Sequence, residues 1–189
     1  MEEKKPDKRV VKTKKNIKDT FLLLLETKPL HQVRVQEILD RAQINRATFY
    51  HYYSDKYDLA DKCASEFLEE IRPLLEKRFD TRYSTEEVQN IIRDIYAYLR
   101  KNRRMVLILW ANEGNGFHLY KDMEDLLQHY YLKRIFPHSD VPPEFQNFVA
   151  RVYSALVMTT IKWHLEEDRD LDSQKLFSLV GESVQKYLL

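Results

Sequence analysis

The residues with the clearest chemistry lie in one short segment, RATFYHYYSDK, residues 46–56. The Arg46 guanidinium can recognise guanine in the major groove of DNA. Thr48 and Tyr50 can reach bases or phosphates, and the Lys56 ammonium can contact the phosphate backbone. These side chains favour a surface that binds nucleic acid.

Catalytic and metal chemistries find little support in the sequence. Neither His31 nor His51 has a carboxylate or nucleophile at a recognisable spacing, and phosphate-loop and dinucleotide glycine motifs are absent. With no HExxH motif, no cysteine pair and only Cys63, we predict no disulfide, no metal and no cofactor. The chain is predicted not to be an enzyme. The remaining histidines, which could suggest a metal site, show no metal-ligand spacing either, and they are His118, His129, His138 and His164.

Helical phase divides the aromatic residues of the segment into two groups. At 100° per residue, Phe49 and Tyr53 share one face and are predicted to pack inward. Ala47 and His51 fall nearly opposite, with Tyr50 beside them. One short helix is therefore expected to hold a core with one face and to present a polar, aromatic face outward.

The preceding residues predict the elements that position this helix. Thr13 is a candidate N-cap for a first helix ending at Pro29, and residues 35–42 carry a one-sided apolar stripe. After a turn at residues 43–44, Asn45 is the predicted N-cap of a third helix over residues 46–53. A short helix, a tight turn and a second helix form the helix-turn-helix, whose second helix enters the major groove.

Residues 14–59 resemble the DNA-binding domain of the TetR family of bacterial transcriptional regulators. That family's pattern ends in a Thr-Phe-Tyr run followed by aromatic residues, a lysine and a leucine, which stands here as TFYHYYSDKYDL over residues 48–59. The resemblance implies a homodimer that binds a double-stranded DNA operator. The predicted DNA-binding residues are Arg34, Arg46, Ala47, Thr48, Tyr50, His51, Tyr52 and Lys56.

Two positions depart from the family's pattern. Gln43 stands in the turn where a glycine is usual, and Arg34 stands where a serine or threonine usually caps the second helix. A non-glycine residue at positive φ is costly, so we expect a slightly different turn geometry.

The whole chain is predicted to be all-α, with about nine helices. Glycine occurs only three times, and helix-forming residues recur at helical spacing, as in the capping box that begins at Ser84 and in helices predicted over residues 144–166 and 173–188. The predicted domains are a flexible basic arm over residues 1–12, a helix-turn-helix domain over 13–56, and a ligand-binding and dimerisation domain over 57–189.

Charge is distributed unevenly. Residues 1–56 hold 13 Lys/Arg and 8 Asp/Glu, a balance of 13 − 8 = +5, although the whole chain carries only +1.

No apolar run is long enough to span a membrane, and the start MEEKKPDKR lacks a signal peptide's apolar segment. We therefore expect a cytoplasmic protein with no membrane partner.

The second half supplies candidate regulatory residues. In the resembled architecture, aromatic side chains there surround a ligand cavity, which would suit a small apolar or aromatic effector. The alternative is that each ring simply fills the core. The predicted ligand-binding residues are Trp110, Asn112, Phe117, Tyr120, Met123, Tyr153, Trp163 and His164.

Two late helices carry apolar stripes with small residues among large ones, which permits close packing against a partner. The resemblance implies that they pair with their counterparts as a four-helix bundle. The predicted dimerisation residues are Phe148, Val152, Leu156, Thr159, Leu176, Val180, Val184 and Tyr187.

The sequence as a whole predicts a dimeric, sequence-specific transcriptional regulator, a repressor released from DNA by a small molecule. One alternative is a DNA-binding accessory or architectural protein whose C-terminal domain binds a protein partner. Another is a small-molecule-binding protein or enzyme that has lost DNA binding. Activation in place of repression also stays open, since the sign depends on where the operator sits.

Overall fold

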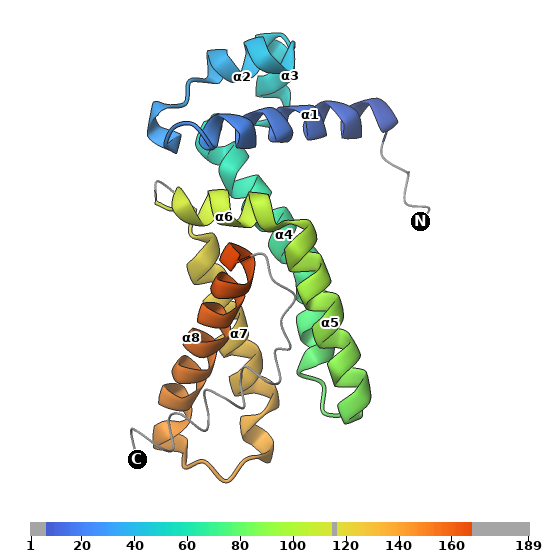
Figure 1. Ribbon diagram of the computed structural model, residues 1–189, viewed down its shortest axis with the longest axis vertical. Coiled ribbons are helices and arrows are strands. Elements are labelled where there is room, and N and C mark those ends of the chain that lie inside the picture. The colour runs from blue at the N-terminus through green and yellow to red at the C-terminus, as the bar shows by residue number, and fades with distance from the viewer. Residues whose placement is uncertain (1–6, 115–116, 168–189) are drawn as a thin grey trace. The chain divides into compact units, whose positions relative to one another are not determined.

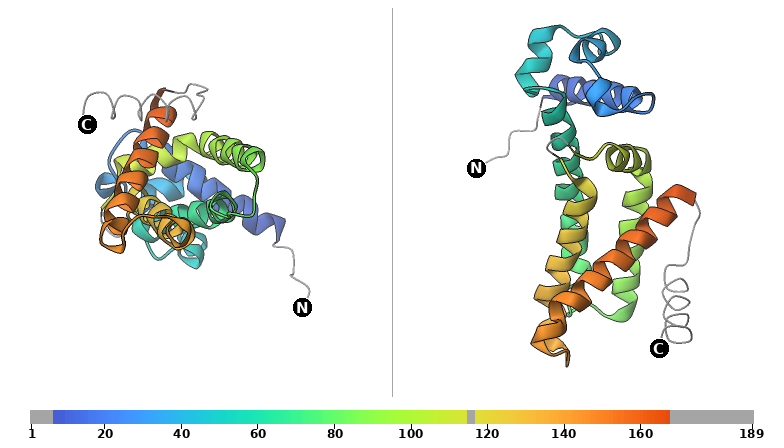
Figure 2. Two further views of the ribbon diagram at one scale, coloured as in Figure 1. Left: turned by 90° about the horizontal axis from the view of Figure 1, so that it is seen from below. Right: turned by 90° about the vertical axis from the view of Figure 1, so that its left-hand side faces the viewer.

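The computed structural model describes residues 7–114 and 117–167. Over these residues the chain is all-α, as predicted, and the predicted last helix over residues 173–188 lies outside them. Figures 1 and 2 show the described helices, which are α1 (Lys8–Leu25), η1 (Leu30–Gln32), α2 (Val35–Ala42), α3 (Arg46–Tyr52), α4 (Lys56–Arg78), α5 (Thr85–Lys101), α6 (Arg103–Ala111), α7 (Leu119–Arg134), η2 (Phe136–His138) and α8 (Pro143–Glu167).

The chain divides into two compact units. Unit 1 comprises the residues up to Leu74 together with Arg104–Asp122, and unit 2 comprises Leu75–Arg103 and the residues from Met123 onward. All three helices of the predicted DNA-binding domain lie in unit 1, which also includes α6 from Arg104 onward and most of α4.

In unit 1, α1, α2 and α3 enclose a small apolar core. Ile17 and Phe21 of α1, Ile38 of α2 and Phe49 of α3 are all fully buried. The Asn16 side chain also donates a hydrogen bond to the Ala42 carbonyl at 2.7 Å, which satisfies one of the open carbonyls at the end of α2. These contacts hold α1, α2 and α3 together, and we call this unit the three-helix head (α1, α2 and α3).

The first helix begins earlier than the sequence predicts. Asp7 is the N-cap, with its carboxylate accepting a hydrogen bond from the Arg9 amide at 2.9 Å. Thr13 is therefore not a cap, and its hydroxyl donates to the Arg9 carbonyl inside the helix. Residues 8–12, predicted as part of a flexible arm, are helical because Asp7 satisfies the helix end and its negative charge favours a helix N-terminus.

The turn between α2 and α3 keeps the geometry that glycine favours. Gln43 has φ 54° and ψ 46°, in the left-handed region. The following Ile44 amide donates to the Leu39 carbonyl at 3.1 Å, the bond that closes a Schellman cap. Gln43 thus reproduces the usual turn geometry at a steric cost, and the expectation of a different geometry is wrong.

Gln43→Gly is expected to leave the turn unchanged and to stabilise the head by up to about 1 kcal/mol. A left-handed conformation costs a non-glycine residue about 1–2 kcal/mol, and the greater freedom of glycine in the unfolded chain offsets part of that gain. Gln43→Val should destabilise the head, since a β-branched side chain fits this region worst. Urea unfolding of the three proteins tests this order, and a glycine variant less stable than the valine variant would contradict it.

In unit 2, α5, α7 and α8 lie side by side with the end of α4, as Figure 2 shows. Aromatic rings join them, since Tyr131 of α7 stacks on Tyr153 of α8 with 4.1 Å between centroids. Phe79, which follows α4 directly, is also buried and packs edge-on against Tyr153. Ser84 and Glu87 form the predicted capping box at the start of α5.

Pro73 lies inside α4, one residue before the last unit 1 residue of that helix. The helix continues to Arg78, so this proline does not end it.

Among the described helices, none is both long and apolar enough to span a membrane.

Candidate nucleic-acid interface

The inner and outer faces of α3 are those predicted from helical phase. Phe49 is fully buried and Tyr53, the residue after the helix, is 2% exposed, whereas Tyr50 is 47% exposed. Arg46, Ala47 and His51 are also exposed, with Thr48 and Tyr52 partly so. The predicted outward side chains therefore form one continuous surface, which we call the α3 face (Arg46, Ala47, Thr48, Tyr50, His51 and Tyr52).

The start of α3 is tightly capped. The Asn45 side-chain oxygen accepts hydrogen bonds from the Thr48 amide at 2.7 Å and from the Thr48 hydroxyl at 2.8 Å, so the predicted N-cap is confirmed. The cap fixes the first turn, where the residues that read base edges lie in a helix-turn-helix. Arg46 stands in that turn, with its guanidinium 6.0 Å from the Tyr50 ring centroid.

A basic surface groove lies on the head itself. It has a volume of about 480 Å³ and is lined by the first half of α1 and by Ile44 of the turn. Three of its lining side chains are cationic (Arg9, Lys12 and Lys15) and one is acidic (Asp19). Lys14 lies over the Tyr52 ring, 5.6 Å from its centroid, so the basic half of α1 adjoins the α3 face.

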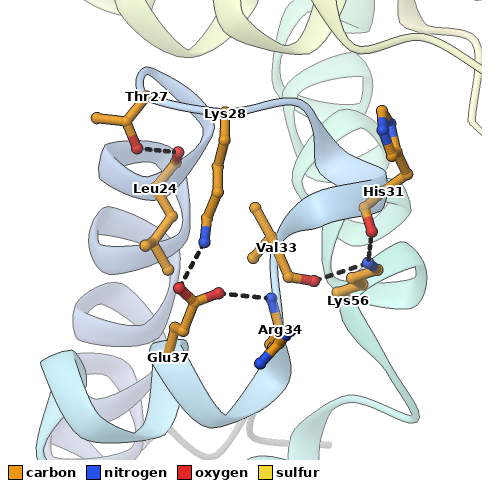
Figure 3. A network of polar contacts seen from close by, with 8 residues as sticks. All are labelled: Leu24, Thr27, Lys28, His31, Val33, Arg34, Glu37 and Lys56. Carbon is orange, nitrogen blue, oxygen red and sulfur yellow. Dashed lines mark hydrogen bonds and ion pairs between the residues drawn. The ribbon is translucent and has the colours of Figure 1, made fainter.

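Arg34, the predicted cap position of α2, is exposed and caps only through its backbone (Figure 3). An arginine side chain has no acceptor atom, so it cannot replace a serine or threonine cap. Instead, the Arg34 amide donates to the Glu37 carboxylate at 2.9 Å, and Lys28 donates to the other oxygen. Lys28 and then the Arg34 amide hold the pKa of Glu37 below its ordinary value. The Arg34 guanidinium makes no cap bond.

Lys56, the first residue of α4, has a structural role that the sequence did not reveal. Its ammonium donates to the His31 carbonyl at 2.8 Å and to the Val33 carbonyl at 2.7 Å (Figure 3). Burial lowers its pKa from the ordinary value. These bonds tie the start of α4 to η1 and use two of the three ammonium donors, which leaves one for a phosphate.

Lys56→Gln is therefore expected to lower the stability of the protein by about 1–2 kcal/mol as well as its DNA affinity, because two backbone carbonyls lose their charged donor. The matched control is Lys77→Gln, an exposed lysine of unit 2 outside this network. Thermal unfolding of both variants tests the role, and a Lys56→Gln protein as stable as wild type would restrict Lys56 to the DNA contact.

The predicted ligand-binding residues do not form one cluster, because they divide between the two units. Trp110, Asn112, Phe117 and Tyr120 belong to unit 1. There the Trp110 ring packs edge-on against Tyr120 with 5.3 Å between centroids. Asn112 has a different partner, since its side-chain oxygen accepts a hydrogen bond from the Leu30 amide at 2.9 Å.

Asn112 follows α6, and Arg104 near the start of α6 also bonds to the head. The Arg104 guanidinium forms a two-point ion pair with Glu26, the residue after α1, with one contact at 2.8 Å. Both ends of α6 are thus bonded within unit 1 to the segment between α1 and α2. Asn112 contributes one of these bonds, in addition to its bond to the Ile108 carbonyl.

The other predicted ligand-binding residues belong to unit 2. Met123 is buried, Trp163 is 37% exposed, and His164 is buried with its ring edge-on to Tyr96 at 4.8 Å. Unit 2 contains a cavity with a volume of about 70 Å³. Of the predicted ligand-binding residues, Tyr153 alone is among its described lining residues. Its lining residues come from α4, α5, α7, α8 and the residue after α4, and they are Leu75, Arg78, Phe79, Ile92, Ile95, Tyr96, Leu127, Tyr153, Val157 and Ile161.

Most of these lining residues were not selected from the sequence. Aliphatic residues at helical spacing indicate burial but not whether they surround a space. Arg78 gave a signal of its own, since a cation three residues after Leu75 and directly before Phe79, both buried, departs from the amphipathic pattern.

The apolar face of α8 is exposed in the described part of the chain. Phe148 is 67% exposed, Val152 51% and Trp163 37%, and Thr159 is exposed as well. Leu156 on the same face is partly exposed. The buried residues of α8, such as Ser154 and Met158, lie on the opposite face. The other predicted dimerisation residues lie outside the described residues, and they are Leu176, Val180, Val184 and Tyr187.

Comparison with known proteins places this surface in a family context. The family model described as "Bacterial regulatory proteins, tetR family" matches residues 22–63, which include α2, α3 and the end of α1. A Bacillus subtilis (strain 168) protein described as "Uncharacterized HTH-type transcriptional regulator YxbF" is 25% identical over 170 residues. That alignment covers 88% of this chain but 43% of the relative, so the chain spans less than half of the relative's length.

Solved structures share the fold at low sequence identity. A gamma-butyrolactone receptor, described as an ArpA-like protein, is 15% identical with a TM-score of 0.54, covering 86% of this chain and 100% of its own. Lin0861 from Listeria innocua is 14% identical with a TM-score of 0.55, covering 97% of this chain and 95% of its own. These matches extend the likeness from the head to the helices of unit 2.

Proposed function

We propose that the protein is a homodimeric, sequence-specific DNA-binding regulator of transcription, whose residues 22–63 form the DNA-binding domain of the tetR family of bacterial regulatory proteins. In this proposal it acts in the cytoplasm as a repressor and leaves its operator when a small molecule binds. It has no catalytic role.

The observation that carries the proposal is the α3 face. Arg46, Tyr50 and His51 are exposed on a helix whose opposite side is fixed by the buried Phe49. A rigid helix with exposed donors in its first turn suits readout of base edges. Arg46 is assigned to sequence readout, whereas Tyr50, Tyr52 and the basic half of α1 are assigned to phosphates.

The exposed apolar face of α8 supports the proposed dimerisation. A stripe of large apolar side chains opposite a buried face marks a surface that another molecule covers. A second copy of this chain is the proposed partner, with the predicted last helix completing the interface. A symmetric dimer presents two α3 helices to successive major grooves, which lie about 34–36 Å apart.

Release by an effector is supported by the cavity of unit 2 and by the bonds of α6. A cavity among apolar helices is the usual form of a small-molecule site. One structure of this fold is a gamma-butyrolactone receptor, which shows that the fold is compatible with a small ligand.

The division between the two units falls between two consecutive arginines at the start of α6, since Arg103 belongs to unit 2 and Arg104 to unit 1. Arg103 donates to the Leu165 carbonyl in unit 2, and Arg104 pairs with Glu26 in unit 1. We propose that α6 carries the effect of the ligand to the head, by favouring a state with lower DNA affinity. The rival function, an accessory protein that binds a protein partner, would suit a filled core better than one with a cavity.

Selection of bound sites from random double-stranded DNA tests the function directly. The purified protein should enrich an inverted repeat whose half-sites are about one helical turn apart, and its affinity should fall steeply as salt is raised. Enrichment of no sequence, with affinity that depends on salt alone, would favour the accessory role. Failure to bind DNA at all would reject the proposal.

A further inference from the structure

The described residues that line the cavity of unit 2 are apolar apart from three. Its walls include the buried Leu75, Phe79, Ile95 and Leu127, which offer no hydrogen bond to a ligand through their side chains. Among the described lining residues, the side chains that could hold a polar ligand group are therefore those of Arg78, Tyr96 and Tyr153. The chemistry of these three groups defines the ligand that the cavity can hold, on the premise that this cavity is the effector site proposed above.

Among the described residues that line the cavity, Arg78 is the only charged one. Its guanidinium lies 5.4 Å from the Phe79 ring centroid, and no carboxylate pairs with it anywhere in the part of the chain that the structure describes. The side chain is only partly exposed. A cation at an apolar cavity gains most from an anion, because the interaction is weakly screened there.

The two tyrosines add neutral hydroxyl groups. Burial raises the pKa of Tyr96 to about 12 and also raises that of Tyr153, on which the nearby Arg78 acts in the opposite direction. Both hydroxyls therefore stay protonated at neutral pH, and neither makes a hydrogen bond to another residue within the described ranges. Each can donate to a ligand oxygen.

We propose that the effector is a small carboxylate with an apolar body, its carboxylate held by Arg78 and Tyr153 and its body by the aliphatic walls. A carboxylate matches the planar fork of a guanidinium and neutralises it with a single negative charge. A phosphate would leave uncompensated charge against apolar walls, which is costly. A neutral apolar molecule would leave the guanidinium without an anion.

The volume limits the size of the ligand. At 10–15 Å³ for each water-sized group, the cavity of about 70 Å³ holds about five to seven such groups. Short-chain carboxylates such as butyrate, with about six non-hydrogen atoms, are in this range, whereas benzoate, with about nine, exceeds it slightly. Longer acyl chains would require the cavity to open.

Two matched probe pairs test the charge requirement, butyrate with butyramide and benzoate with benzamide. Each amide has nearly the shape of its acid but lacks the charge. With the full-length protein, calorimetric titration should give at least about tenfold tighter binding of the better acid than of its amide. Arg78→Gln should remove that difference, and Tyr153→Phe should weaken the acid alone.

The control is Arg93→Gln, which removes an exposed arginine of α5 that does not line the cavity. It should bind the acid as wild type does. Thermal unfolding identifies any variant that fails to fold. If Arg78→Gln fails to fold, Arg78→Lys takes its place, because it keeps the charge without the planar fork. Its affinity for the acid should lie between that of wild type for the acid and that of wild type for the amide. Equal binding of acid and amide, acid binding unchanged in Arg78→Gln, or no binding of either acid would each overturn the proposal.

The same proteins separate this inference from the proposed function. DNA affinity is measured without ligand and then with saturating acid. An acid that binds through Arg78 but leaves DNA affinity unchanged would support the site and reject effector release. A protein that binds DNA and responds to no carboxylate would retain the DNA-binding function and lose this inference.

Discussion

Phe49→Ala is expected to unfold the three-helix head, whereas the neighbouring Tyr50→Ala is expected to leave the fold intact and remove most of the DNA affinity. Phe49 is fully buried among residues of α1 and α2, and a buried Phe→Ala change costs about 3–5 kcal/mol. That is a large fraction of the about 5–15 kcal/mol that stabilises a typical domain.

Tyr50 is 47% exposed, so its removal should change stability by less than about 1 kcal/mol. Within the protein, Tyr50→Ala removes an edge contact with Phe49 and the ring that lies near the Arg46 guanidinium. Its loss should nevertheless lower operator affinity at least about tenfold, since it removes a proposed phosphate contact and loosens Arg46.

Circular dichroism melting and fluorescence anisotropy with a labelled duplex measure the two effects separately. Asp61→Asn, an exposed change on α4 away from the α3 face, is the control and should change neither. If Tyr50→Ala bound the operator as tightly as wild type does, the outward face of α3 would not be the interface. If Phe49→Ala melted as wild type does, the account of the head core would be wrong.

Charge introduced on the exposed face of α8 is expected to convert the proposed dimer to a monomer. Val152→Asp places a carboxylate at the middle of the stripe that includes Phe148 and Trp163, where it would be buried without a partner in the dimer. Unpaired buried charge costs several kcal/mol, which corresponds to a loss of dimer affinity of about a hundredfold or more.

Light scattering coupled to size exclusion measures this change as a halving of the mass. Operator affinity should fall with it, because the second head no longer binds at a high effective concentration. Gln89→Asp, on the exposed side of α5, is the matched control and should stay dimeric. A Val152→Asp protein that remains dimeric would assign dimerisation to another surface.

Local features of the fold were predictable because they depend on residues close in sequence. The caps at Asn45 and Ser84 follow from one side chain and amides three residues away. The division of α3 into inward and outward faces follows from helical phase alone. The start of α1 was missed because a run of lysines resembles a solvated tail, although Asp7 caps the helix that contains it.

The features that could not be predicted depend on distant partners. Lys56 bonds to carbonyls of His31 and Val33, far earlier in the chain, and nothing in its local pattern reveals them. Asn112 was selected as a polar ligand contact, but its oxygen faces the Leu30 amide. The aromatic residues selected for the ligand site are divided between two units because ring type does not encode which helices pack together.

The most direct test of the central claim is the salt dependence of operator binding, measured with a duplex obtained by selection. If the α3 faces of a dimer bind DNA together with the basic half of α1, log affinity should fall linearly with log salt, with a slope of magnitude about 0.9 for each phosphate contacted. We predict several such contacts per dimer, and affinity for the selected site at least about a thousandfold above that for random DNA. A slope near zero, or equal affinity for both duplexes, would contradict the account.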